Sequence, residues 1–185
     1  MTVYTFRVRL RPNPPLGFEP DTDVWRDVEL DSSHTLADFH DAIFEAFDRW
    51  DAHGYEFTTY NDDGMATRRY VDPHFYDGGP SWPAIEGSEI ERFIDQAAPD
   101  DVSEDVKEQF RDLRSDPPAE ADAAESTIED VVSEHSGSLH YEFDFGDGWE
   151  HHIELREMLD GELDGDPHVI DEHGDAPAQY PDTDD

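Results

Sequence analysis

Hydrophobic and polar residues alternate on both sides of a short glycine-containing segment in the last third of the chain. Every second residue from 139 to 145 is leucine or aromatic, and the alternation resumes from 149 to 155. Alternation with period two places one set of side chains on a single face of a strand. Between the runs, Gly146-Asp147-Gly148 favours a tight turn, because these residues accept positive φ angles at low cost. The sequence therefore predicts a β-hairpin with one buried aromatic face, which includes Phe145.

The same alternation predicts four more strands elsewhere in the chain. They cover residues 4–10, 24–30, 53–59 and 65–70, and the last two are joined by an Asn-Asp-Asp-Gly turn. The first strand carries arginines on its polar face, for which surface ion pairing is the simplest interpretation.

Helical spacing begins at Thr35, which forms a capping box with Asp38. After it, apolar residues recur at helical intervals as far as Trp50 and predict a helix with one apolar face. Further helices are predicted at 88–97 and 99–113, and a short one runs from the Ser126 cap to Gly137. The proline-containing, acidic residues 116–125 between them are interpreted as a solvated linker.

Strands and helices follow one another without regular βαβ alternation. This order favours an α+β fold with a mainly antiparallel sheet and helices packed on one face. One domain is predicted over residues 1–160, followed by an acidic tail rich in glycine and proline at 161–185.

Acidic residues dominate the charge: 12 lysines and arginines face 49 aspartates and glutamates, which gives a formal net charge of −37. Lys107 is the only lysine. Acid spread along the whole chain with almost no lysine is typical of proteins adapted to molar intracellular salt, where the Debye length is ~3 Å. The alternative is an acidic protein that mimics a partner at ordinary salt.

Cysteine is absent, so neither disulfides nor thiolate chemistry is available. No apolar run approaches the ~20 residues of a membrane helix, and the chain enters a strand pattern at once without a signal region. These features predict a soluble, cytoplasmic protein with no membrane partner.

Four polar residues that lie within aromatic segments form a candidate metal or ligand site: His40, His53, Asp147 and His151, with Asp144 in support. Imidazole and carboxylate suit a divalent metal such as zinc, manganese or iron. The structural alternative makes His40 a histidine at the core edge and His151 a neighbour of Trp149, while the two aspartates accept turn N–H groups. No HExxH spacing decides between these interpretations.

Trp25 and Arg26 form a second candidate ligand-binding pair, through cation–π and bidentate contacts. Trp149 completes the candidate ligand-binding set. Alternatively, Trp25 belongs to the core and Arg26 pairs with an acid such as Asp144 or Asp147.

Several of these residues, taken in chain order, resemble the plasmid pRiA4b ORF-3-like proteins over roughly residues 3–160. The resemblance is carried by Val24-Trp25-Arg26, Thr35-Leu36, Phe39-His40, Ala42-Ile43, Ala46-Phe47, Trp50, His53, Phe57 and the run 141–151. It implies an α+β domain without an established activity, and some members are labelled resolvase-type passengers of insertion elements. Ala176 stands where relatives often carry cysteine, so any thiol-dependent property of those relatives cannot operate here.

Motifs for nucleophilic catalysis or phosphate binding are missing: there is no GxSxG, Walker A or GxGxxG sequence. The sequence has no basic stripe of the kind that binds nucleic acid. We therefore predict a cytoplasmic binding or interaction domain, for which a protein or small-ligand partner is favoured over nucleic acid. Its ligand would meet the hairpin tip, the helix at His40 and the strand at His53. The alternatives are a metal-dependent enzyme, for example a hydrolase, and a mobile-element accessory protein that acts with a recombinase.

Overall fold

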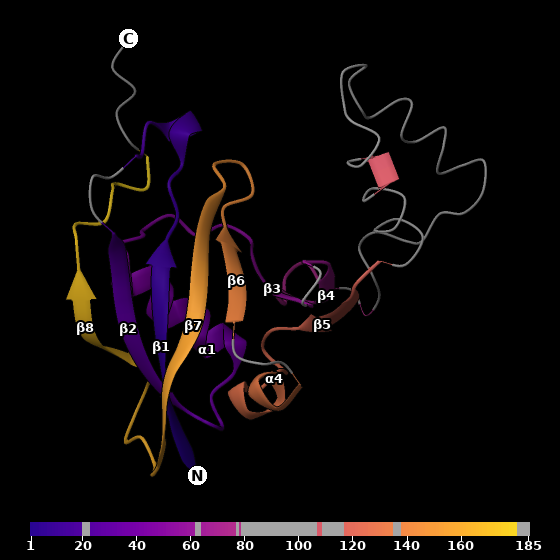
Figure 1. The fold of residues 1–185 in the computed structure, drawn as a ribbon, viewed down its shortest axis with the longest axis vertical. Coiled ribbons are helices and arrows are strands. Elements are labelled where there is room, and N and C mark those ends of the chain that lie inside the picture. The colour runs from indigo at the N-terminus through magenta and orange to yellow at the C-terminus, as the bar shows by residue number, and fades with distance from the viewer. Residues whose placement is uncertain are drawn as a thin grey trace.

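The computed structural model describes residues 1–19, 23–61, 64–76, 78, 107–108, 117–134 and 138–180. These residues form one eight-stranded sheet of order β5-β4-β3-β6-β7-β1-β2-β8, with two α-helices in the same described part (Figure 1). The elements are β1 (Thr2–Leu10), the 3-10 helix η1 (Pro14–Leu16), β2 (Val24–Asp31), α1 (Leu36–Ala46), β3 (Tyr55–Tyr60), β4 (Ala66–Val71), β5 (Ala119–Asp122), α4 (Ile128–Glu134), β6 (Ser138–Phe143), β7 (Trp149–Asp160) and β8 (His168–His173).

The sheet is mixed. β4 and β5 pair in parallel, and the other neighbouring strands pair antiparallel. Strands and helices do not alternate regularly, which agrees with the predicted α+β class. None of the helices in the described ranges is long and apolar enough to cross a bilayer.

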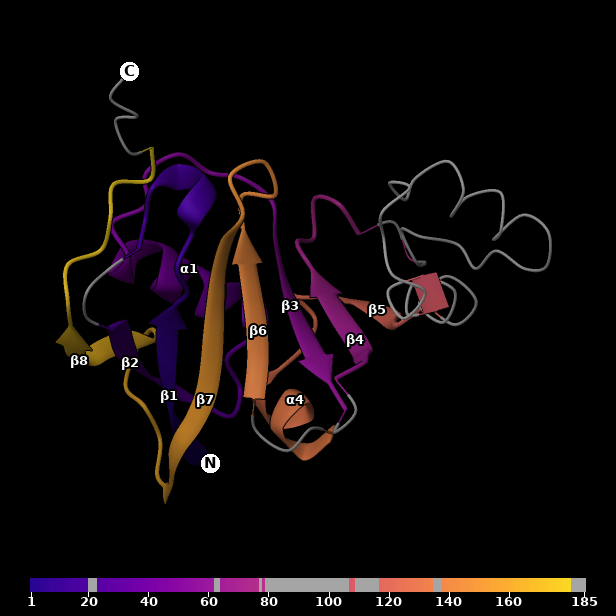
Figure 2. The same ribbon diagram turned by 45° about the horizontal axis from the view of Figure 1, so that its top comes forward.

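The predicted hairpin is confirmed as β6 and β7, which lie in the middle of the sheet (Figure 2). Phe143 lies opposite Trp149, and the N–H of Gly148 donates to the carbonyl of Asp144 at 2.6 Å to close the turn. The prediction that Phe145 is buried is wrong, because its side chain is 52% exposed. The strand ends at Phe143, and Asp144 has a left-handed φ of 58° that turns the chain out of the alternating pattern.

The capping box of α1 is confirmed: the Asp38 N–H donates to Thr35 Oγ1 at 3.1 Å, and the Thr35 N–H donates to Asp38 Oδ2 at 2.7 Å. α1 lies behind the sheet in Figure 1, where Phe39 packs against aromatic rings of β1 and β3. The helix ends at Ala46, and Trp50 is 71% exposed rather than buried. Asp48, with φ of 53°, takes the left-handed conformation that commonly ends a helix.

The segment 116–125, interpreted as a solvated linker, contains strand β5, which pairs with β4. The short helix that follows begins one residue later than predicted, because Thr127 rather than Ser126 exchanges capping contacts with Asp130. The predicted helices at 88–97 and 99–113 lie outside the described residues, apart from 107–108, as does Gly137.

Part of the segment expected to be a tail joins the sheet. β8 pairs with β2, and Gln179 is fully buried. The Trp149 indole N–H donates to the Gln179 carbonyl at 3.2 Å, while Gln179 Oε1 accepts from the N–H groups of Trp50 and Asp51 at 3.0 Å each. Residues close to the end of the chain are therefore tied to both the hairpin and the loop after α1.

Candidate functional site

A cleft of about 610 Å³ lies between α1, the residues that lead into β3 and the residues that follow β4. We call it the histidine cleft. Its polar and aromatic lining among the described residues is His40, Asp41, His53, Tyr55, Asp72, His74 and Phe75. Two predicted site residues, one from the helix and one from the start of a strand, are thus brought to one cavity.

His40 is held on two sides. Its ring stacks on Tyr55 with centroids 3.6 Å apart and planes 4° apart, and its Nδ1 lies 2.8 Å from the Tyr141 hydroxyl. Burial lowers the pKa of His40 to about 4, and the charge of Asp72 opposes this shift only partly. Burial also raises the pKa of Tyr141 well above its usual value, so the phenol stays protonated. When Tyr141 donates to Nδ1, the neutral imidazole carries its proton on Nε2.

His53 connects the histidine cleft to the hairpin turn. Its Nε2 lies 2.9 Å from the Tyr180 hydroxyl, 3.5 Å from Asp51 Oδ2 and 3.6 Å from Asp144 Oδ2. Asp144 also accepts from the N–H of Gly146 at 3.2 Å, which is the turn-stabilising role expected of it. The histidine is therefore surrounded by acceptors that orient its ring.

Asp41, Asp72 and His74 also line the histidine cleft, and the sequence analysis did not predict them as site residues. His74 Nδ1 lies 2.9 Å from Asp72 Oδ1, and the Asp72 backbone N–H donates to the Tyr55 carbonyl. Burial and the neighbouring Asp38 raise the pKa of Asp41. The only sequence signal for this corner is the turn-forming Asp-Pro-His that follows a strand.

His151 does not reach the histidine cleft. It is 1% exposed and lies among core rings, with centroids 4.8 Å from Phe47 and 5.2 Å from Tyr141. Neither ring nitrogen has a hydrogen-bond partner in the described part of the chain. Burial, with a smaller contribution from Arg49, lowers its pKa to about 3. The alternation along β7 turns this residue into the core, together with Trp149.

The four predicted metal ligands do not converge. His40 and His53 share the histidine cleft, His151 is in the core, and Asp147 lies in the hairpin turn, where its carbonyl accepts from Asn13 at 2.8 Å. Within the described ranges, no group of three or more His, Asp or Glu side chains is arranged to hold a metal ion.

Trp25 and Arg26 do not form a joint clamp. Trp25 is half-buried between the Arg7 guanidinium, 3.6 Å from its ring centroid, and the ring of His173. Arg26 is buried, and its guanidinium donates to the Ala46 carbonyl at 2.9 Å and to the His173 carbonyl at 3.1 Å.

Arg26 pairs with an acid, as expected, but neither Asp144 nor Asp147 is that acid. The guanidinium instead joins the end of α1 to β8, because β2 lies next to β8 in the sheet. The acid nearest to it is Glu172 on β8, at 3.6 Å.

The chain is similar to a known protein family and to a solved structure. The family model described as plasmid pRiA4b ORF-3-like protein matches residues 3–180. A crystal structure of a protein of unknown function from Methanosarcina mazei Go1 is similar, with a TM-score of 0.57 and 18% sequence identity over 96% of this chain and 72% of that one. No curated protein matches the chain.

Proposed function

The chain belongs to the plasmid pRiA4b ORF-3-like protein family, and from that premise we propose that it is a non-enzymatic binding domain whose polar ligand occupies the histidine cleft. The observation that carries the proposal is the convergence of His40 and His53 from separate elements on one cavity of about 610 Å³. A cavity of this size with a few convergent polar groups is typical of small-molecule sites.

The lining suits recognition by hydrogen bonds rather than by a fixed charge on the imidazole. His40 is neutral at pH 7, because burial lowers its pKa to about 4. Asp72 and Asp41 lie on the same cavity and offer acceptors. A ligand with both donors and acceptors would satisfy these groups together.

The polar side chains are held in place before any ligand arrives. Tyr55 and Tyr141 hold His40, and Tyr180 and Asp51 hold His53. A preorganised site loses less conformational entropy on binding, which favours affinity. His53 is also 40% exposed at its side chain, so it is accessible to a ligand.

The test is a ligand-observed NMR screen of polar small molecules against the full chain. We expect at least one class of ligand to bind and to lose at least about tenfold in affinity, or ~1.4 kcal/mol, in both His40→Phe and His53→Ala. His152→Ala is the matched control, because His152 is an exposed histidine on β7 that does not line the histidine cleft. Binding that is unchanged in both cleft variants would refute the proposal.

A zinc and manganese titration on the same proteins tests the metal-dependent alternative. Under our proposal, neither metal binds stoichiometrically to the wild-type chain. Stoichiometric binding that disappears in His53→Ala would favour an enzyme that uses this cavity.

We further propose that the acidic surface is an adaptation to molar salt. The net charge of −37 opposes compaction unless salt screens it. Thermal melts should show a clearly higher midpoint in molar than in dilute potassium chloride. A midpoint that does not respond to potassium chloride would contradict this adaptation.

A further inference from the structure

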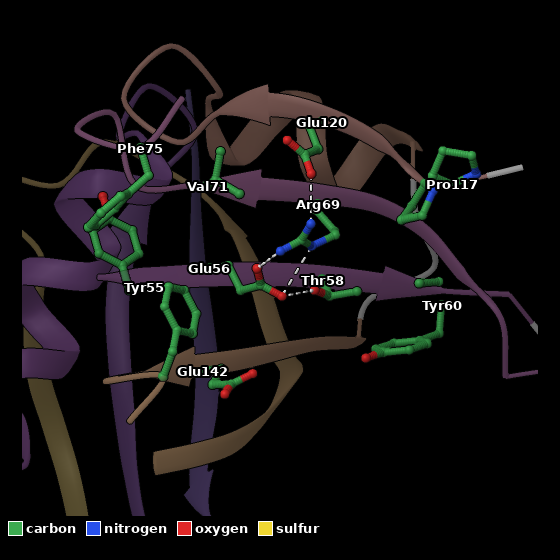
Figure 3. Close-up of a pocket in the computed structure, with 13 residues that line it drawn as sticks. Tyr55, Glu56, Thr58, Tyr60, Arg69, Val71, Phe75, Pro117, Glu120 and Glu142 are labelled. Atoms are coloured by element: carbon green, nitrogen blue, oxygen red, sulfur yellow. Dashed lines mark hydrogen bonds and ion pairs between the residues drawn. The ribbon is translucent and has the colours of Figure 1, made fainter. Parts of the chain in front are cut away.

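A second cavity, of about 550 Å³, lies over β3, β4, β5 and β6 (Figure 3). We call it the glutamate pocket. Its charged lining residues are Glu56, Arg69, Glu120 and Glu142. Among the described residues it contains one cationic side chain and three carboxylates, so this part of its lining differs in charge from the histidine cleft.

The arginine among the described lining residues of this pocket is already paired. Arg69 donates to Glu120 at 2.6 Å and also forms an ion pair with Glu56, and both interactions are drawn in Figure 3. The Glu120 and Glu56 side chains are 3% and 13% exposed, so these contacts neutralise carboxylates that are largely removed from water. Arg69 therefore makes direct ion pairs with Glu56 and Glu120, while its charge only partly opposes the rise in the pKa of Glu142.

Glu142 lies in the middle of a row of like charges. The strand register places it directly opposite Glu56 on β3 and directly opposite Glu150 on β7. Glu150 has Arg11 at 3.6 Å, whereas Glu142 has no hydrogen bond or ion pair among the described residues. Burial, followed by the charges of Glu56 and Glu150, raises the pKa of Glu142. Like charges directly opposite each other destabilise a sheet, so this row has a cost that an added cation would offset.

Aromatic and apolar side chains complete the glutamate pocket. Tyr60, Phe75 and Phe145 all line it and are 49%, 63% and 52% exposed, respectively. Three large exposed rings around carboxylates suit an alkyl chain that ends in a cation, because ring faces attract cations and cover methylene groups. A bare metal ion would require several converging oxygen ligands, and the described residues contain no such group.

We propose that the glutamate pocket binds an organic cation, an alkylammonium or guanidinium group, with its charge at Glu142 and its carbon chain against the aromatic side chains. The same chemistry is carried by a free polyamine and by a lysine or arginine side chain of another protein. The proposed cation gives Glu142 the direct ion pair that no described residue makes with it.

The test is an NMR titration of the labelled full chain with n-butylammonium, and with n-butanol as the uncharged equivalent. We expect saturable shifts at Glu142 and at the neighbouring residues of β3 with butylammonium, and much weaker ones with butanol. Glu142→Gln should weaken butylammonium binding at least tenfold while leaving the chain folded, because the change removes like-charge repulsion. Glu157→Gln, at an exposed glutamate on β7, is the charge-matched control and should bind like the wild type.

Spermidine and the amides of acetyl-lysine and acetyl-arginine, titrated in parallel, distinguish the two sources of the cation. Preference for spermidine indicates a free polyamine, and preference for an amino-acid amide indicates a basic segment of a partner protein. Equal binding of butylammonium and butanol, or unchanged binding to Glu142→Gln, would overturn the proposal. Neither result would affect the histidine-cleft proposal, which is tested with other variants.

Discussion

The histidine cleft and the glutamate pocket are neighbours in which burial disfavours the charged form of a side chain, of a base in one and of an acid in the other. Tyr55 and Phe75 line both cavities. In the histidine cleft, burial lowers the pKa of His40 to about 4 and leaves it uncharged at pH 7. In the glutamate pocket, burial and neighbouring acids raise the pKa of Glu142 within a row of carboxylates. The same physical effect thus favours hydrogen-bond recognition on one side of the shared rings and cation recognition on the other.

The two cavities also differ in how the chain builds them. The histidine cleft gathers residues from a helix, the residues before a strand and the turn after another strand. The glutamate pocket lies over strand centres, where cross-strand register sets which side chains are opposite one another. Loops tolerate adjustment better than a paired sheet does, so we expect the glutamate pocket to be the more rigid of the two.

Removal of Arg69 should give the largest effect on stability. Arg69→Met leaves Glu56 and Glu120 without their shared cation, and both carboxylates are largely buried. Breaking a buried ion pair from one side costs about 3–5 kcal/mol, which chemical denaturation should detect as a lower midpoint. Arg156→Met, at an exposed arginine 3.8 Å from Glu154, should cost less than about 0.5 kcal/mol. Equal losses in the two variants would show that the Arg69 pairs contribute no more than a surface pair.

Acidification should destabilise the protein through its buried histidines. The folded-state pKa is about 4 for His40 and about 3 for His151, both below the ordinary value of 6.5. As the pH falls, the unfolded chain takes up these protons before the folded chain does. The contribution of the two neutral histidines to stability is therefore complete above pH 6.5, and it is lost as the pH falls toward their folded-state pKa values. The loss reaches about 2 kcal/mol per histidine by about pH 5, measurable by denaturation across this range.

The glutamate pocket should respond to pH with the opposite sign. The folded-state pKa of Glu142 is raised, so its charge penalises the folded state at neutral pH and the penalty is relieved as pH falls through that pKa. Glu142→Gln should therefore make the loss of stability with falling pH steeper, and His40→Phe should make it shallower. If the stability of both variants depended on pH as in the wild type, Glu142 and His40 would not have the opposite effects on acid stability that we predict.

Replacement of His151 should stabilise the fold. His151→Leu removes a buried imidazole whose two nitrogens lack hydrogen-bond partners among the described residues, which should gain about 1 kcal/mol at pH 7. The replacement should also remove the part of the stability loss on acidification that is due to His151. His152→Leu, at the exposed neighbour on the other side of β7, should change stability by less than about 0.5 kcal/mol. A clear loss of stability in His151→Leu would indicate that the imidazole makes favourable interactions in the core.

Gly54→Ala should have the smallest effect on stability and yet disturb both cavities. An added Cβ would lie 2.7 Å from Phe75 Cε2 and 3.0 Å from Phe145 Cε2, and both of these rings are exposed enough to move. We expect a cost below about 1 kcal/mol, together with NMR shifts on both sides of the shared rings. Gly161→Ala, whose Cβ would meet Val3 at an ordinary 3.6 Å, is the control. Shifts confined to one cavity would show that the two are independent.

Local patterns predicted the elements that depend on near neighbours. The alternation around Gly146 and Gly148 identified the hairpin, and Thr35 with Asp38 identified the start of α1. The same patterns failed where the backbone turns. Phe145 and Trp50 fit their periodicities but lie beyond left-handed residues that direct them to solvent.

For the candidate sites, the sequence alone predicted that His40 and His53 contribute to one ligand-binding face, and it determined that the chain carries a large excess of acid. Only the tertiary structure decided that His151 lies in the core, that Arg26 joins α1 to β8, and that Glu142 is opposite two other glutamates. The physical reason is range: periodicity and capping act over a few residues. Strand register and the burial of a side chain depend on segments far apart in the chain, which meet only on folding.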